Sequence, residues 1–442
     1  MHPALLIGCT SVFESLCPGP GCAIALVAMK RPEILAPAGN MEILETACIY
    51  GADAVYLGLR GESNLRAFAR NFSHEELVQG VTYAHGKGVK VYLALNTYPH
   101  NCQYEEIPAL IDTAKNAGVD AVIVSDIGVM NMVRQLAPSL PIHLSTQANA
   151  VSSHAVNAWA GLGVSRAILA RELSCEEIAD IRRSTRCELE IFIHGSVCIS
   201  VSGRCLISDY LAHRGANQGQ CTQPCRWDYA MMERTREGQY MPLEEEDGFT
   251  FLYNSRDLCL LPVFGKVMAL GLDGLKIEGR NKASLYVATV VSVYRQARDA
   301  YIMNPETFSV SPRWMEEIGK VSNRQYFTGF FEEKPDQEGI NYDFTRYDQS
   351  HHLAARVIGA TDGMTILEAR NPLIEGMELE RMAPSGERQV FPLEGAIFED
   401  NTVTHIKPNQ VFSVKTLFVP QPGELIRKSF SEGDKVVPGR EG

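Results

Sequence analysis

Four cysteines lie within one short stretch of the chain, and their thiols have the clearest capacity for metal or redox chemistry. Cys198 is followed by Cys205, Cys221 and Cys225, with six, fifteen and three residues between them. In a long chain without a convincing export signal, such a cluster indicates metal or redox chemistry rather than a disulfide framework. Glycines that let the backbone fold closely around a compact group stand at positions 195, 203, 215 and 219.

The spacing of these cysteines favours an iron–sulfur cluster. Structural zinc usually takes two tight Cys-x₂₋₄-Cys pairs, and only Cys221 and Cys225 fit that pattern. A cluster accepts more varied spacing, because four thiolates need only converge on one cube. Zinc and buried free thiols are the alternatives. Cys259 is a reserve fourth ligand, and it also fits a buried cysteine on a helix.

A second set of polar side chains falls at or just beyond the ends of predicted strands, where barrel enzymes gather their active-site residues. About half of them should be loop caps or salt bridges, but together they predict a polar pocket. Three arginines in the set could hold an anion, because guanidinium groups match the geometry of carboxylate and phosphate. The set is Asn40, Asn64, Arg66, Asn96, Asp126, Gln147, Asn149, Arg171, Glu172, His194, Glu278 and Arg280.

Within this set we take His194, Glu278 and Asp126 as catalytic candidates, and Asn96 and Gln147 as candidate substrate ligands. The same residues give little support to a hydrolase. Ser196 is close to His194 in sequence, yet the chain has no Gly-x-Ser-x-Gly elbow. A His-Glu-x-x-His motif is absent too, which excludes a zincin at the level of motifs.

The elements that must position these groups alternate regularly from residue 33, as short apolar runs followed by amphipathic stretches. The runs are rich in β-branched residues, as buried parallel strands are. Eight strand–helix units in about 270 residues predict an α/β fold, a (β/α)₈ TIM-like barrel, with an open doubly wound sheet as the alternative. The predicted strands are Ile34–Ala38, Ala54–Leu59, Val89–Asn96, Ala121–Asp126, Ile142–Ala148, Arg166–Glu172, Leu189–Gly195 and Leu275–Arg280.

Helical patterns lie between these strands. Ser73 with Glu76, and Ser174 with Glu177, form the sequence signature of a capping box. The predicted helices include Asn40–Tyr50, Ser73–Lys87, Ile107–Ala117, Ser174–Arg183 and a helix near Ser284–Tyr301.

The predicted domain organisation has five parts. Residues 1–29 form a leader, 30–303 the barrel with the cysteine-rich insertion 195–274, and 304–350 a linker. Residues 351–430 form a small all-β C-terminal barrel, and 431–442 a polar tail. The strands predicted for the C-terminal part are Leu353–Ile358, Met364–Ala369, Met377–Met382, Arg388–Pro392 and Val411–Lys415, separated by turn residues.

Composition and the first residues bear on partners and location. The 41 basic and 53 acidic side chains give a net charge of −12, which argues against a generic nucleic-acid coat but leaves room for a local basic patch. No run approaches the ~20 apolar residues of a membrane span. The first 28 residues lack the basic start of a secretory signal, so we expect an upstream start codon wrongly chosen and a cytoplasmic protein. A cleaved or lipidated leader is the alternative.

Several runs of the sequence resemble the collagenase-like peptidase family U32. They are Leu35–Asn40, Gly51–Gly58, His194–Cys198, Ser202–Cys205 and Lys276–Arg280. Within that family, the chain is similar to a branch of prephenate-dependent tRNA uridine hydroxylases. That similarity rests on Ser145–Ala150, Arg171–Ser174 and Asn217–Trp227, and the resemblance as a whole covers about residues 31 to 430.

The resemblance implies an enzyme that hydroxylates the wobble uridine of tRNA to 5-hydroxyuridine without molecular oxygen, with prephenate as co-substrate. It also implies a [4Fe–4S] cluster on Cys198, Cys205 and Cys221, with a fourth ligand that differs among relatives. We favour Cys225 over Cys259 for that place. A U32-type peptidase and a hydroxylase of ribosomal RNA are the alternative functions.

The same resemblance suggests roles for the cationic residues. Arg66, Arg171 and Arg280 are candidates for holding the two carboxylates of the donor. Arg204, Arg214 and Arg226 could hold RNA phosphates, and Trp227 could stack on a base.

Overall fold

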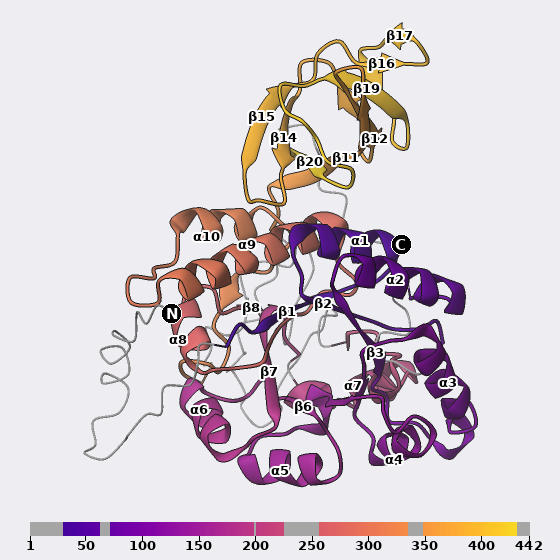
Figure 1. Cartoon of the computed structure of the whole chain (residues 1–442), viewed down its shortest axis with the longest axis vertical. Coiled ribbons are helices and arrows are strands. Elements are labelled where there is room, and N and C mark those ends of the chain that lie inside the picture. Colours follow the sequence, from indigo (N-terminus) through magenta and orange to yellow (C-terminus); the bar gives the residue numbers. More distant parts are fainter. Residues whose placement is uncertain (1–29, 62–70, 199, 225–255, 335–347, 431–442) are drawn as a thin grey trace, which may run out of the picture.

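Eight parallel strands close into a barrel in the computed structural model, which describes residues 30–61, 71–198, 200–224, 256–334 and 348–430. The strands follow one another around the barrel in chain order, and β9 pairs in parallel with both β7 and β1 to close it (Figure 1). The predicted (β/α)₈ barrel is therefore confirmed. Its strands are β1 (Glu33–Pro37), β2 (Ala54–Leu57), β3 (Lys90–Leu95), β4 (Ala121–Val124), β5 (Ile142–Leu144), β6 (Arg166–Ile168), β7 (Glu188–Ser196) and β9 (Gly274–Ile277).

Helices cover the outside of this barrel, and their ends follow the expected capping chemistry. Ser73 and Ser174 each accept a hydrogen bond from the backbone N–H three residues on, and both predicted capping boxes are present. The helices around the barrel are α1 (Met41–Tyr50), α2 (His74–Gly86), α3 (Ile107–Ala117), α4 (Ile127–Leu136), α5 (Ser153–Gly161), α6 (Cys175–Ser184), α8 (Phe264–Ala269) and α9 (Ser284–Met303).

Several barrel strands end earlier, at their carboxyl ends, than the apolar pattern predicted. The run Ile142–Ala148 was predicted as one strand, but β5 stops at Leu144 and residues 146–148 form a short helical turn. The Ser145 side chain starts that turn by accepting a hydrogen bond from the Gln147 backbone N–H. Such turns move polar side chains off the strands and onto the rim of the barrel.

The insertion between β7 and β9 contains structure that the sequence did not indicate. Its first part holds the short helix α7 (Ile207–Ala212), and its last part forms β8 (Asp257–Cys259), which pairs antiparallel with the end of β7. The expectation of a helix around Cys259 is therefore wrong. Antiparallel pairing directs the side chain of Cys259 beside His194, its register partner.

The segment 304–350 was expected to be a linker, but much of it packs against the barrel. It contains α10 (Pro312–Gly319) and β10 (Tyr326–Phe327), which pairs with β8. Ile318, Val321 and Phe331 from this segment are buried in the core of the barrel. Ile318 lies on α10, whereas Val321 and Phe331 lie outside the helix and the strand, where apolar residues follow no period that the sequence pattern could show.

The C-terminal part is a separate antiparallel sheet with its own apolar core (Figure 1). The five predicted strands are present, and β20 (Leu425–Ser429) lies between β14 and β11 near the middle of the sheet. The pattern missed β20 because it buries Arg427 and Lys428 as well as Leu425 and Ile426. The other strands of the sheet are β11 (His351–Thr361), β12 (Met364–Ala369), β14 (Glu378–Met382), β15 (Arg388–Pro392), β16 (Ile397–Phe398), β17 (Asn401–Thr402) and β19 (Val411–Lys415), while β13 (Leu373–Ile374) and β18 (His405–Ile406) form a separate two-stranded sheet.

Polar contacts fix this sheet against the outer helices of the barrel. The hydroxyl of Tyr50 on α1 donates to the Met382 carbonyl over 2.6 Å and accepts from the Leu425 N–H over 2.9 Å. Glu317 on α10 pairs with Arg388 and Arg427 of the sheet, each at 2.9 Å. The C-terminal sheet is thus joined to the barrel by buried contacts.

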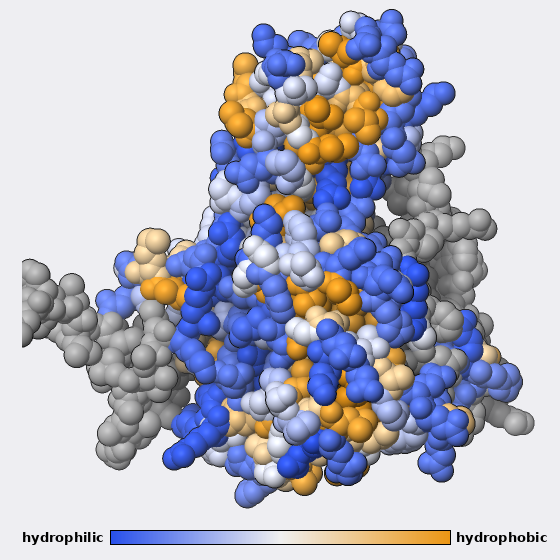
Figure 2. Space-filling model, turned by 45° about the vertical axis from the view of Figure 1, so that its right-hand side comes forward, coloured by the Kyte–Doolittle hydropathy of each residue, from blue (hydrophilic) through white to orange (hydrophobic). Residues whose placement is uncertain are grey.

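The surface in Figure 2 is largely hydrophilic over the barrel, with apolar side chains showing on the C-terminal sheet. Leu417 and Val419 are among the exposed apolar residues of that sheet. Within the described residues, no helix has the length and apolar character required to cross a membrane.

Candidate functional site

A cavity of about 140 Å³ lies at the carboxyl ends of the barrel strands, which is the end where (β/α)₈ enzymes carry their active sites. The barrel and the cysteine-rich insertion both contribute to its wall. The lining residues are Tyr56, Ala94, Asn96, Ile123, Ser145, Thr146, Gln147, Ile168, Arg171, Phe192, Cys198, Ser202, Cys205, Ala216, Cys221, Pro224, Lys276, Glu278 and Arg280.

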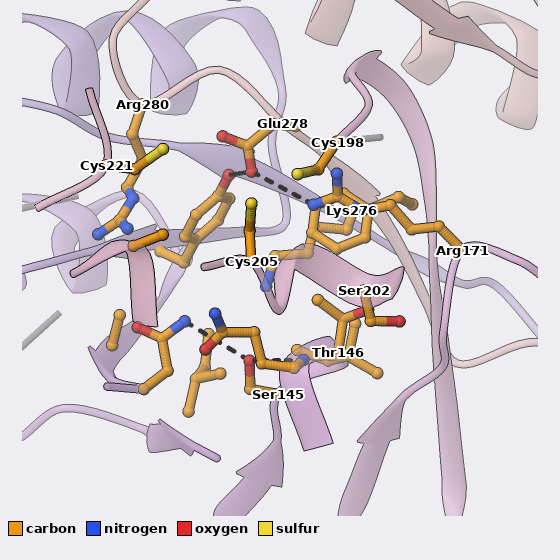
Figure 3. A pocket seen from close by; sticks show the side chains of 18 of the residues that line it. Ser145, Thr146, Arg171, Cys198, Ser202, Cys205, Cys221, Lys276, Glu278 and Arg280 are labelled. Carbon is orange, nitrogen blue, oxygen red and sulfur yellow. Dashed lines mark hydrogen bonds and ion pairs between the residues drawn. The ribbon is translucent and has the colours of Figure 1, made fainter. Parts of the chain in front are cut away.

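Three of the four predicted cluster ligands line this one cavity. Cys198 follows the end of β7, Cys205 precedes α7, and Cys221 follows it; in the view of Figure 3, Cys198 and Cys205 lie near Lys276 and Glu278, and Cys221 lies near Arg280. Residues far apart in the loop are thus brought to one cavity. Cys225 lies outside the described residues.

Each of the three sulfur atoms has a hydrogen-bonding group two residues further along the chain. The Ile207 N–H donates to the sulfur of Cys205 over 3.4 Å, and the Gln223 N–H donates to that of Cys221 over 3.3 Å. The Ser200 hydroxyl lies 2.9 Å from the sulfur of Cys198. Hydrogen bonds to sulfur favour the thiolate over the thiol, and they are one of the ways in which proteins tune iron–sulfur clusters.

The donor set therefore has the chemistry that a thiolate-held group requires. Among the described residues, no three His, Cys, Asp or Glu side chains stand close enough together to hold a single metal ion. A cluster makes a different demand, because its thiolates are distributed over several iron atoms around a cube. The three thiols line one cavity, and each has a hydrogen-bonding group close by, so their chemistry fits that demand.

Cys259, the reserve ligand, is not among the residues that line the cavity. Its side chain is buried, and its sulfur lies 3.7 Å from the hydroxyl of Tyr294 on α9. Burial raises the pKa of the Cys259 thiol to about 11, which favours the neutral form. Its position is that of a core cysteine.

Cations and aromatic rings lie next to one another in the lining of the cavity. The guanidinium carbon of Arg171 lies 4.0 Å from the centre of the Phe192 ring. The ammonium of Lys276 lies 5.5 Å from that ring and 4.2 Å from the ring of Tyr56, and the guanidinium carbon of Arg280 lies 5.8 Å from the Tyr56 ring. Aromatic faces attract cations, so the two rings help to hold three positive charges at this cavity.

One carboxylate accompanies these cations at the cavity. Glu278 lies 4.0 Å from Arg171, and the Tyr56 hydroxyl is 3.3 Å from the same carboxylate oxygen. Glu278 is therefore the predicted catalytic residue that the structure places at the cavity. The predicted ligands Asn96, Gln147, Arg171 and Arg280 also line it.

Lys276 was missed by the sequence analysis although it lies in the resemblance motif with Glu278 and Arg280. Strand β9 ends at Ile277, and side chains two positions apart on a strand point to the same face, so Lys276 and Glu278 could have been paired from the alternation alone. Burial lowers the pKa of Lys276, and the negative charge of Glu190 opposes that change. Its ammonium lies 3.4 Å from Glu190, which is itself fully buried.

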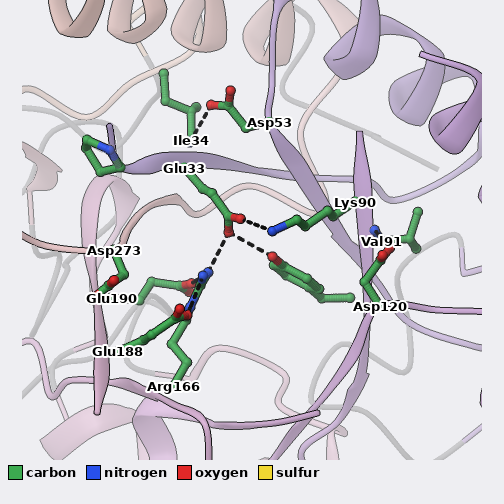
Figure 4. A network of polar contacts seen from close by, with 12 residues as sticks. Glu33, Ile34, Asp53, Lys90, Val91, Asp120, Arg166, Glu188, Glu190 and Asp273 are labelled. Carbon is green, nitrogen blue, oxygen red and sulfur yellow. Dashed lines mark hydrogen bonds and ion pairs between the residues drawn. The ribbon is translucent and has the colours of Figure 1, made fainter. Parts of the chain in front are cut away.

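Below Lys276, charged side chains continue through the inside of the barrel to its amino end (Figure 4). Arg166 lies 3.3 Å from Glu190, 2.7 Å from Glu33 and 2.8 Å from Glu188. Glu33 also accepts a hydrogen bond from the Tyr92 hydroxyl over 2.8 Å. This chain of alternating charges supplies a partner for the buried Lys276 and anchors the floor of the cavity from beneath.

His194 and Asp126, the other two predicted catalytic residues, are not among the residues that line the cavity. His194 is buried against the rings of Tyr286, Tyr294 and Tyr326, and burial together with Lys282 lowers its pKa to about 3. Asp126 caps α4 by accepting from the N–H groups of residues 128 and 129, and it also accepts from a tyrosine hydroxyl. Strand-end position alone could not separate these structural roles from pocket residues.

Other strand-end candidates have structural contacts as well. Asn40 caps α1 by accepting from the Ile43 N–H. Asn149 and Glu172 both accept hydrogen bonds from Ser202, which holds the cysteine-rich loop against the barrel rim. The candidates Asn64, Arg66, Arg226 and Trp227 lie outside the described residues.

A second and wider cavity of about 750 Å³ adjoins the first, and Cys205 and Ala216 line both. Arg204, a predicted RNA contact, lies on its wall rather than in the thiol-lined cavity. The remaining lining residues are Tyr98, His100, Leu206, Asp209, Gly215 and Asn217.

Comparison with known proteins identifies relatives over most of the chain. The family model described as peptidase family U32 matches residues 39–341. The chain is 37% identical to tRNA hydroxylation protein P1 of Bacillus subtilis (91% of this chain, 96% of that protein) and 34% identical to tRNA hydroxylation protein P of Escherichia coli (90% and 96%). A protein of Porphyromonas gingivalis named collagenase is 31% identical over 68% of this chain and 73% of its own length.

Proposed function

Because this chain belongs to peptidase family U32, and relatives named for tRNA hydroxylation match it nearly from end to end, we propose that it is a tRNA-modifying enzyme. The reaction we propose is hydroxylation of the wobble uridine to 5-hydroxyuridine, with a [4Fe–4S] cluster and with prephenate as co-substrate. One observation carries the proposal. Three thiols and three cations line a single cavity.

Cys198, Cys205 and Cys221 would hold the cluster, with Cys225 as the fourth ligand. Once bound there, a cluster would supply electron transfer to a substrate in the cavity. The hydrogen-bonding groups two residues after each of the three cysteines support this assignment, because hydrogen bonds to sulfur are one of the ways in which proteins tune iron–sulfur clusters.

The cations of the cavity suit a small dicarboxylate such as prephenate. Lys276 shares the Phe192 ring with Arg171 and the Tyr56 ring with Arg280, so the three cations could hold two carboxylates at once. Glu278 is the acidic side chain among these cations and is the candidate for moving a proton at the bound substrate.

A peptidase would need His194 as its general base, and the position of His194 does not support that role. His194 is fully buried and held neutral, outside the cavity that contains the other polar groups. A general base must reach the nucleophile it activates.

Deleting the gene should remove 5-hydroxyuridine and its derivatives from tRNA, provided that any parallel oxygen-dependent route is deleted too. Mass spectrometry of nucleosides from purified tRNA and ribosomal RNA measures this. Loss of a ribosomal RNA modification in place of the tRNA nucleoside would favour the alternative hydroxylase. Unchanged nucleosides in both RNAs would contradict the proposed function.

Replacing the cluster ligands tests the same proposal at the level of the site. Cys198→Ser, Cys205→Ser and Cys221→Ser should each lose iron and fail to restore the tRNA nucleoside, because a hydroxyl is a poor substitute for a soft thiolate. Cys102→Ser is the matched control, since Cys102 is exposed and lies outside the cavity. Anaerobic iron and sulfide determination reports cluster content, and full restoration by a triple-serine variant would exclude a role for the cluster.

A further inference from the structure

The wider of the two cavities has no role in the proposed chemistry of the thiols and the small anion. Its volume of about 750 Å³ falls within the range of pockets that enclose small organic ligands. It meets the thiol-lined cavity at Cys205 and Ala216, so a ligand in the wide cavity lies next to the proposed cluster.

Two planar side chains, Arg204 and Tyr98, lie next to each other in the lining of the wide cavity. The guanidinium carbon of Arg204 lies 5.4 Å from the centre of the Tyr98 ring, and one Arg204 nitrogen donates to the Tyr98 hydroxyl over 2.8 Å. The Tyr98 hydroxyl in turn donates to the Gln147 carbonyl over 2.7 Å, and Arg204 Nε donates to the same carbonyl over 2.8 Å. Both side chains are therefore fixed before any ligand arrives, which lowers the entropy cost of binding.

The rest of the wall is polar and carries little net charge. His100, Asp209 and Asn217 line the cavity with Leu206. Asn217 donates to the Cys205 carbonyl over 3.4 Å, and its Oδ1 is a buried acceptor without a partner among the described residues. Two preorganised planar groups, with hydrogen-bonding side chains in the same lining, differ from the group of cations in the neighbouring cavity.

Those features match a nucleobase better than a second small anion. Proteins hold unstacked RNA bases on aromatic rings and on guanidinium planes, and they read the edges of the bases by hydrogen bonds. An enzyme that modifies a base must also bring that base out of its stack to reach it. Resting on the proposed function, we propose that the wide cavity binds the extruded pyrimidine nucleotide of the RNA substrate, with its base stacked on the Arg204–Tyr98 pair.

The proposal predicts an energetic coupling between Arg204 and one particular base. Two fluorescein-labelled anticodon stem-loop RNAs serve as probes, one with uridine at the wobble position and one with an abasic residue there. The full chain with its cluster, kept anaerobic, should bind the uridine RNA about ten-fold more tightly than the abasic RNA in fluorescence anisotropy, since stacking of one base has an effect of that order.

Arg204→Ala should remove most of that ten-fold difference, and Arg204→Lys should remove it while keeping the salt dependence of binding, because an ammonium keeps the charge but not the plane. Arg186→Ala is the matched control. Arg186 is an exposed arginine just before β7, at the opposite end of the barrel, and its loss should leave the difference unchanged. Tyr98→Ala provides a second variant should Arg204→Ala fail to fold.

Equal weakening of both RNAs by Arg204→Ala would overturn the inference, since the residue would then contribute only charge. The absence of any preference of the wild-type protein for uridine over the abasic residue would overturn it as well. Neither result bears on whether tRNA is hydroxylated, which the nucleoside analysis measures separately. The two proposals can therefore fail independently.

Discussion

At the residue scale, the least expected feature of the site is a fully buried lysine. Lys276 is kept inside the barrel by the charge of Glu190 and by two aromatic rings, and Glu190 is balanced in turn by Arg166. A buried charge is tolerated only when it is paired in this way. The arrangement leaves the ammonium at the cavity floor, where it can meet an anion.

Lys276→Met should therefore weaken the binding of prephenate by roughly 10- to 100-fold, which is the usual effect of losing a hydrogen bond to a charged group. Calorimetric titration of prephenate into the anaerobic full chain measures the affinity. Lys115→Met, at an exposed position on α3, is the control. Unchanged affinity in Lys276→Met, with the cluster content intact, would remove Lys276 from the anion site.

His194 leads to a prediction about pH. Its pKa is lowered to about 3 in the folded protein, while an unfolded histidine titrates near 6.5. Between these values the unfolded chain binds a proton that the folded chain does not, so stability falls as pH decreases from about 6.5 toward 3 by up to about 1.4 kcal/mol per pH unit. Above pH 6.5 this contribution is constant.

Exchange of His194 for an uncharged ring should remove that dependence. His194→Phe should show a smaller drop in thermal midpoint between pH 7 and pH 5 than the wild-type protein, measured anaerobically under matched conditions. His351→Phe serves as a comparison, because the pKa of His351 is lowered to about 4 by burial at a site on the C-terminal sheet. Identical pH responses of wild type and His194→Phe would show that His194 is protonated in the folded state.

At the element scale, strand β7 joins the barrel to the cysteine-rich loop through a glycine that no other residue type replaces easily. Gly195 has φ +107°, and a Cβ built there would lie 2.4 Å from the carbonyl oxygen of Glu278. The close approach lets β7 and β9 bring Cys198 and Glu278 to the same cavity. Gly195 thus allows the strand that leads to Cys198 to lie against the strand end that carries Glu278.

Gly195→Ala should destabilise the protein by about 1–3 kcal/mol through backbone strain and should also reduce hydroxylation, since Glu278 must move. Urea unfolding and the tRNA nucleoside assay measure the two effects. Gly86→Ala is the control, because Gly86 ends helix α2 and has open space where a Cβ would lie. Normal activity in Gly195→Ala would show that the cavity tolerates a shift of this strand.

At the scale of the whole molecule, the C-terminal sheet is fixed to the barrel by a buried carboxylate. Glu317 on α10 accepts hydrogen bonds from Arg388 and Arg427 of the sheet and from Lys320. Arg427 is completely buried, so removal of Glu317 would leave a cation in the interior whose remaining ion-pair partner among the described residues is Glu380. The position of the sheet relative to the barrel depends on this network.

Glu317→Ala should cost about 3–5 kcal/mol, as expected when one member of a buried ion pair is removed, and the sheet should unfold before the barrel. Limited proteolysis would then release a barrel fragment that the wild-type protein does not yield. Glu316→Ala, an exposed neighbour on the same helix, should behave as wild type. A single cooperative transition with unchanged midpoint in Glu317→Ala would show that other contacts hold the sheet.

Much of this protein is determined by local sequence patterns. The eight barrel strands, the capping boxes at Ser73 and Ser174 and the five predicted C-terminal strands follow from apolar periodicity and short-range hydrogen bonding, which neighbouring residues specify on their own. The spacing of cysteines and glycines likewise marks the loop that carries the thiols. Barrel topology then places strand ends on one rim, so Arg171, Glu278 and Arg280 could be assigned to the pocket in advance.

Only the tertiary structure decides which of the strand-end side chains face the cavity. Asp126 and His194 look like pocket residues in the sequence, but a helix cap occupies the first and three tyrosines from α9 and β10 enclose the second. Lys276, strand β20 and the packed segment after α9 were missed because their stability depends on partners distant in sequence. Burial of charge is a property of pairs across the fold, and no local pattern records which pairs will meet.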